Sequence, residues 1–134
     1  MPYQGRPDGL YLVMQKSPTK GVDHYGILDI GNKLLVQGAD GINPVIVHQC
    51  PPSIRADLLE GTGTWNILGR ITDEQYAIAR YKAALADPAY NLFGHNCEHF
   101  ARFVATGVRE SKQLQAAGAI AVCATLAFVV LRSA

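Results

Sequence analysis

Short apolar segments separated by turn-forming residues make up the first half of the chain. Residues 9–15 (GLYLVMQ), 24–31 (HYGILDIG), 33–37 (KLLVQ) and 44–49 (PVIVHQ) are rich in apolar, aromatic or β-branched side chains. Clusters of Gly, Pro and Asn lie between these segments, and such clusters mark turns. The pattern predicts several short strands in an antiparallel sheet, to which residues 64–71 add one more.

The pattern becomes helical after residue 71. Thr72 is followed three residues later by Gln75 with two acids between them, which is the pattern of a capping box. It predicts a helix that continues to about Ala86 and ends before the Asp87-Pro88 pair. Strands followed by helices predict an α+β domain.

A second helix is expected from near Asn96, with Gly107 just beyond its end. Side chains at i, i+3, i+4 and i+7 share one face of a helix, and here they are Cys97, Phe100, Ala101 and Val104. This face should pack on the sheet, with Cys97 in the first turn. A Glu98–Arg102 pair on the helix surface would contribute only about 0.3 kcal/mol.

Composition narrows the class of protein. A chain of 134 residues suits one domain, and a formal charge of +1 argues against nucleic acid as a partner. Three cysteines are not a disulfide framework, which favours a reducing compartment. The first residues have no apolar core of a signal peptide, so none is expected.

Cys97 is the first candidate for chemistry. Unpaired backbone N–H groups at a helix start stabilise a thiolate, so the pKa of Cys97 should fall, and they can also hold an oxyanion. One alternative is an inert buried thiol. A metal site at the H-x-C-x-H run (95–99) is a weaker alternative, because the usual spaced ligand pairs are missing.

A nucleophilic thiol needs a base, and two histidines can supply it. His24 opens one predicted strand and His48 closes another, so antiparallel pairing can bring them together. One ring would then deprotonate Cys97 while the other orients it. The alternative for each histidine is a purely structural role.

These residues carry a family resemblance. HYGILDIGN (24–32) and NCEHFARF (96–103) resemble the H-box and NC motifs of the lecithin:retinol acyltransferase-like family, a circularly permuted NlpC/P60 branch of papain-like thiol enzymes. VIVHQCPP (45–52) is similar to the family's second histidine segment. The resemblance covers about residues 9–107 and implies a permuted NlpC/P60-like α+β fold, with a small antiparallel sheet packed against helices.

The resemblance also implies roles for individual residues. Cys97 matches the nucleophile, His24 the general base and His48 the polar residue that orients the base. Asn96 and Glu98 match positions that support the helix start, and with Tyr25 they are assigned to binding. A rival alignment places Gln37 of KLLVQ in the third catalytic position, because a longer segment than usual separates the two histidines.

The implied activity is that of a cysteine-dependent acyltransferase or hydrolase. It would act through a covalent acyl-thioester, with a phospholipid-type lipid as the acyl donor. The alternatives are a thiol peptidase or amidase of NlpC/P60 type and an inactive, membrane-anchored interaction module. No glycine-rich nucleotide loop is present, so no cofactor is expected.

The C-terminal residues suggest where this chemistry takes place. Residues 116–131 are uncharged and would form a helix about 24 Å long, close to the ~30 Å of a hydrocarbon core. We therefore expect a catalytic domain over 1–111 and a hydrophobic helix over 112–134 that anchors it in a membrane. Arg109 and Lys112 precede the apolar run, which predicts a cytoplasmic catalytic domain. The alternative is a helix buried within the domain.

Overall fold

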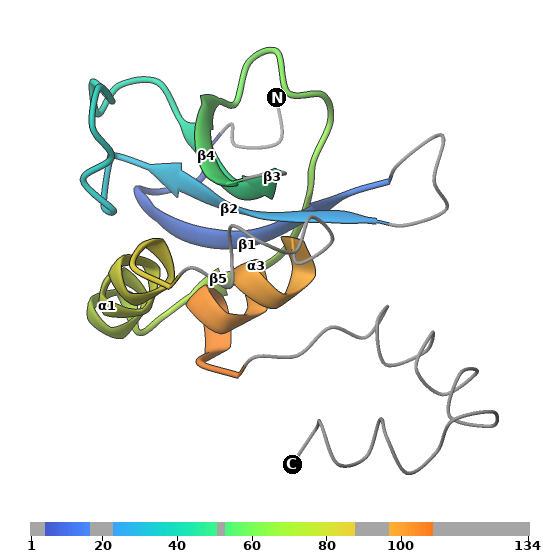
Figure 1. Ribbon diagram of the computed structural model, residues 1–134. Coiled ribbons are helices and arrows are strands. Elements are labelled where there is room, and N and C mark those ends of the chain that lie inside the picture. The colour runs from blue at the N-terminus through green and yellow to red at the C-terminus, as the bar shows by residue number, and fades with distance from the viewer. Residues whose placement is uncertain (1–4, 17–22, 51–52, 88–96, 109–134) are drawn as a thin grey trace, which may run out of the picture.

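The computed structural model describes residues 5–16, 23–50, 53–87 and 97–108. These residues form an α+β fold in which helices α1 and α3 lie on the same side of a five-stranded antiparallel sheet (Figure 1). The strand order is β4-β3-β2-β1-β5. The strands are β1 (Gly9–Gln15), β2 (His24–Ile30), β3 (Val45–Cys50), β4 (Ser53–Leu58) and β5 (Asn66–Ile71).

Strand alternation divides the buried side chains between the two faces of the sheet. The helix face presents residues such as Leu10, Ile27 and Val47, which pack with Phe100 of α3. The opposite face, here called the Trp65 face, presents Tyr11, Leu28 and Ile46 to the Trp65 ring. The predicted α+β class and antiparallel sheet are therefore confirmed.

Residues 33–37 were expected to form a strand, and this expectation is wrong. Asn32 and Leu35 have left-handed backbones, with φ of 54° and 55°, which do not fit a strand. The buried Asp29 carboxylate accepts hydrogen bonds from the N–H groups of Lys33 (2.8 Å) and Leu34 (2.9 Å). These bonds hold the segment as a turn after β2.

Strand β4 is absent from the sequence prediction. It lies at the edge of the sheet, and polar Ser53, Arg55 and Asp57 alternate with apolar residues, so its sequence lacks an apolar run. Its pairing with β3 places His48 opposite Arg55 and Cys50 opposite Ser53. The chain reaches this pairing directly after the short connection 51–52.

Two of the predicted helices are present, with one correction at the first. Helix α1 (Glu74–Leu85) follows Asp73 as its N-cap, and no side-chain hydrogen bond caps it. The expected Thr72–Gln75 capping box is therefore wrong, because the helix begins one residue too late for those two side chains to be in register. Helix α3 (Cys97–Thr106) ends as predicted at Gly107, which has φ 81° and donates its N–H to the Phe103 carbonyl at 2.8 Å.

The apolar face of α3 packs as predicted. Phe100, Ala101 and Val104 are fully buried in the core on the helix face. The helix expected over 112–134 lies outside the described residues. Within the described part of the chain, no helix is both long enough and apolar enough to cross a bilayer.

Candidate functional site

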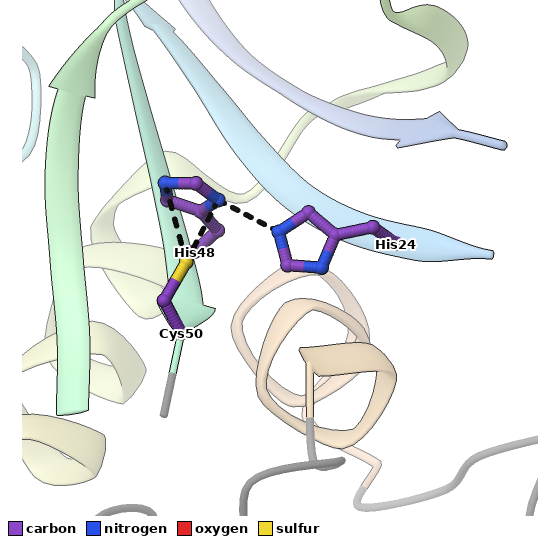
Figure 2. Close-up of side chains that lie close together, drawn as sticks. All are labelled: His24, His48 and Cys50. Atoms are coloured by element: carbon purple, nitrogen blue, oxygen red, sulfur yellow. Dashed lines mark hydrogen bonds between the residues drawn. The ribbon is translucent and has the colours of Figure 1, made fainter. Parts of the chain in front are cut away.

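Strands β2 and β3 bring two histidines into contact. His24 is the first residue of β2, and His48 lies near the end of β3. Gly26 lies against His48, where an added Cβ would be 3.3 Å from the His48 Cβ. His24 Nε2 lies 2.7 Å from His48 Nδ1 (Figure 2). The structure thus brings together the two histidines that were expected to be neighbours.

Asp57 extends this pair to a third residue. Its Oδ2 atom lies 2.8 Å from His48 Nε2, and its Oδ1 atom accepts a hydrogen bond from Arg55 at 3.1 Å. The hydrogen bond from His48 is the main cause that lowers the pKa of Asp57. Sequence reasoning missed Asp57, because its position becomes visible only once β4 is recognised as a strand.

The chain of contacts sets the proton positions. An ionised Asp57 can only accept, so His48 Nε2–H donates to it. In a neutral His48 ring, Nδ1 then carries a lone pair and accepts the His24 Nε2–H. Burial, followed by repulsion from His48, lowers the pKa of His24 to about 4. His24 is therefore neutral at pH 7, and its Nδ1 is left as a proton acceptor.

Trp65 closes the site from one side. Its ring centroid lies 5.6 Å from that of His24 and 6.0 Å from that of His48. The indole is buried and donates its Nε1–H to Thr62 Oγ1 at 2.8 Å. This apolar wall restricts both imidazole rings and reduces their contact with water.

Cys97 lies at the start of β2 rather than within the histidine pair. Its side chain is 7 % exposed, and Sγ donates to the Asp23 carbonyl at 3.8 Å. Burial raises the pKa of Cys97, although the backbone N–H groups of Tyr25 and Glu98 act in the opposite direction. The expectation of a lowered thiol pKa is therefore wrong, since desolvation outweighs the helix start.

The thiol and the histidines belong to different faces of the sheet. His24 has the strand parity of Leu28 and faces Trp65, whereas Cys97 approaches from the helix face next to Tyr25. Among the described residues, no hydrogen bond joins Cys97 Sγ to either imidazole. Cys97 and His24 both lie at the start of β2, because Asp23, whose carbonyl contacts the sulfur, directly precedes His24.

A second thiol touches the histidine pair directly. Cys50 Sγ lies 3.4 Å from His48 Nδ1 and 3.7 Å from His48 Nε2. The near-equal distances place the sulfur against the ring rather than in line with one nitrogen, as Figure 2 shows. Cys50 and Cys97 are both free. Sequence reasoning did not select Cys50, although its position two residues after His48 on a strand puts both on one face.

The residues assigned to binding occupy different places. Glu98 is fully buried and accepts a hydrogen bond from Arg102 Nε at 2.8 Å. The Arg102 guanidinium lies over the Tyr25 ring, 5.2 Å from its centroid. Glu98 and Tyr25 thus fasten α3 to β2. Asn96 lies outside the described residues, and Gln37 is exposed on the turn after β2 rather than beside His24.

Comparisons of the chain with protein-family models, with curated proteins and with solved structures return no match. The resemblance to the lecithin:retinol acyltransferase-like family therefore rests on the motifs around His24, His48 and Cys97. Any assignment of function has to be argued from these residues and their geometry.

Proposed function

We propose that the chain is a cysteine-dependent acyltransferase or hydrolase that forms an acyl-thioester on Cys97. The observation that carries this proposal is the hydrogen-bonded chain from His24 through His48 to Asp57. This chain ends at His24, the residue directly after Asp23, whose carbonyl contacts the Cys97 sulfur. An oriented neutral imidazole that can turn toward a thiol at a helix start is suited to nucleophilic catalysis.

In the proposed reaction, His24 Nδ1 takes the proton from Cys97 Sγ. The sulfur attacks an ester carbonyl, and the C–S bond forms as the carbonyl oxygen becomes an oxyanion. Collapse of this intermediate expels the alcohol, which takes the proton from His24, and leaves an acyl-thioester. An amine, an alcohol or water then attacks the thioester, and the thiol is regenerated.

The pKa directions support proton transfer during the attack rather than a thiolate–imidazolium pair formed beforehand. The pKa of Cys97 is raised by burial and that of His24 is lowered by burial, so both groups are neutral at rest. The reaction also requires the His24 ring to turn around the strand end toward Cys97. His24 is the first residue of β2, where such a rotation disturbs the fewest sheet contacts.

A lipid acyl donor is the favoured substrate, on the strength of the motif resemblance and the apolar residues 116–131. The permuted NlpC/P60-like topology, the membrane anchor and the cytoplasmic location belong to the same proposal. A thiol peptidase is the second candidate. One observation favours it: β4 is an edge strand beside His48, and its free backbone groups can pair with an extended peptide.

Mass spectrometry of the covalent adduct tests the proposal. The full-length chain is offered an activated ester, a phospholipid in micelles and a peptide library in parallel. We expect an acyl adduct on Cys97 from the ester and the phospholipid, and its loss in Cys97→Ser. Cys123→Ser is the matched control, and it should acylate as fast as the parent.

Three results would count against parts of this proposal. Acylation of Cys97→Ser at the parent rate would refute the nucleophile, and an adduct on Cys50 would reassign it. Turnover of peptides without any lipid adduct would replace the lipid substrate by a peptide. The absence of every adduct would leave the fold as an inactive interaction module.

A further inference from the structure

We infer that His24, His48 and Cys50 form a binding site for a soft divalent metal ion, with Zn²⁺ as the best fit. One ligand atom from each of these residues, a ring nitrogen of each histidine and the Cys50 sulfur, lies within 4.8 Å of the other two. The acyl-transfer steps do not use Cys50, but they do use both histidines, so a bound ion would compete with the proposed reaction for His24 and His48.

The donor set is the first argument. Imidazole nitrogen and thiolate sulfur are the ligands that Zn²⁺ takes in proteins, and oxygen-seeking ions such as Mg²⁺ avoid them. Three protein ligands leave one tetrahedral position open to water. The ligands come from two adjacent strands, β2 and β3, which fix the backbone positions of all three residues.

The spacing is the second argument. A tetrahedral Zn²⁺ needs its two nitrogen ligands about 3.3 Å apart and a nitrogen and a sulfur about 3.6 Å apart. The observed separations are 2.7 Å between the two imidazole nitrogens and 3.4 Å between Cys50 Sγ and His48 Nδ1. The metal would take the place of the hydrogen-bonding proton, and the two rings would part by about 0.6 Å.

One side chain has to rotate. Cys50 Sγ lies against the His48 ring (Figure 2). A metal ion bound to Nδ1 would instead lie in line with that nitrogen, in the plane of the ring. Cys50 is the last residue of β3 and is partly exposed, so rotation about its Cα–Cβ bond moves the sulfur toward the ion without disturbing the core.

Asp57 supplies the outer support that such sites require. Histidine ligands of zinc commonly donate their second N–H to a carboxylate, which fixes the tautomer and the direction of the coordinating lone pair. His48 Nε2 lies 2.8 Å from Asp57 Oδ2, so Nδ1 is the nitrogen left to bind metal. The Asp57 carboxylate can therefore accept the His48 Nε2–H both when His48 Nδ1 accepts from His24 and when it binds a metal ion.

Binding can be measured on the reduced full-length chain with Zn²⁺ in competition with a chromophoric chelator, and with Co²⁺ as a spectroscopic substitute. We expect one ion per chain and a thiolate-to-cobalt absorption band. Cys50→Ser should abolish the band and weaken Zn²⁺ binding on the order of 100-fold, and Asp57→Asn should weaken it about tenfold. Cys97→Ser, the matched control, should keep both the band and the affinity.

The controls separate this inference from the proposed function, because the readout is metal binding rather than acyl transfer. A band that survives in Cys50→Ser and disappears in Cys97→Ser would overturn the site, as would the absence of any binding at micromolar Zn²⁺. Circular dichroism checks that each variant is folded. If Cys50→Ser does not fold, the inference is tested with Asp57→Asn instead. An unchanged Zn²⁺ affinity in that variant overturns the inference.

Discussion

Each face of the sheet carries an acid joined to a basic side chain at 2.8 Å, and the two pairs differ in burial. On the helix face, Glu98 is fully buried and bonds to Arg102. On the Trp65 face, Asp57 bonds to His48, and 31 % of the Asp57 side chain is exposed. The two ion pairs therefore have the same length, but one acid is buried and the other is partly exposed to water.

The difference shows that burial, rather than distance, determines what each pair does. Removing Arg102 takes a charged partner away from the fully buried Glu98, which is costly. Removing Asp57 leaves a ring that water can reach through the exposed carboxylate site, so the loss of stability is small. The first pair lies within α3 and holds the Arg102 guanidinium over Tyr25 of β2, whereas the second is suited to orienting a ring.

The largest expected effect comes from the helix face. Arg102→Met removes a charged partner from the buried Glu98 carboxylate, and we expect the free energy of unfolding to fall by about 3 kcal/mol in urea denaturation. Arg55→Met is the matched control. Arg55 also bonds to an acid, but its side chain is 59 % exposed, so its removal should cost less than about 1 kcal/mol. Equal losses of unfolding free energy in the two variants would show that burial does not decide how much an ion pair contributes.

His24, on the Trp65 face, should make the stability of the fold depend on pH. The pKa of His24 in the folded chain is about 4, against the usual 6.5 of a histidine. Between these values the unfolded chain binds a proton that the folded chain does not, so stability falls as the pH drops through this window. We expect a loss of about 1–2 kcal/mol, because the partly exposed ring is partly screened.

The measurement is chemical denaturation from pH 7 to pH 4.5, with EDTA present to keep the site free of metal. His24→Gln is the control, and its stability should depend less on pH in this window. The lowered pKa of Asp57 removes stability only at still lower pH, below its usual value of 3.8. Identical pH profiles for parent and variant would show that His24 is not held neutral by the fold.

Much of the fold follows from local sequence patterns. Apolar runs and turn residues predict β1, β2, β3 and β5, and the spacing on α3 predicts its buried face. The adjacency of His24 and His48 follows from strand ends that meet in an antiparallel pair. These features depend on residues close in sequence or on simple pairing, which a pattern can show.

The remaining features depend on tertiary packing. Strand β4 has an edge-strand sequence without an apolar run, so Asp57 could not be placed beside His48. Glu98 looks like a surface residue of a helix, and its burial appears only when α3 packs against Tyr25. The raised pKa of Cys97 has the same origin, since the sequence indicates a helix start but not how deeply the sulfur lies.

The smallest expected change in stability, less than about 1 kcal/mol, comes from Asp57→Asn, because the carboxylate is partly exposed. Its effect on chemistry should be larger. The asparagine NH₂ group can donate to His48 Nε2, which moves the His48 proton to Nδ1 and turns that atom from an acceptor into a donor. His24 then accepts at Nε2 and carries its proton on Nδ1, so it cannot take the thiol proton. We expect ester acylation of Cys97 to slow by at least about tenfold.

Asp57→Glu should restore much of this rate, because a carboxylate again accepts from His48. Asp73→Asn is the matched control and should acylate at the parent rate, because Asp73 pairs with Arg80 away from the histidines. The rate is followed as adduct formation by mass spectrometry, and stability by urea denaturation of the same samples. A large loss of stability with an unchanged acylation rate would make Asp57 a structural residue. The two faces of the sheet would then carry pairs of the same kind, despite the difference in burial between Glu98 and Asp57.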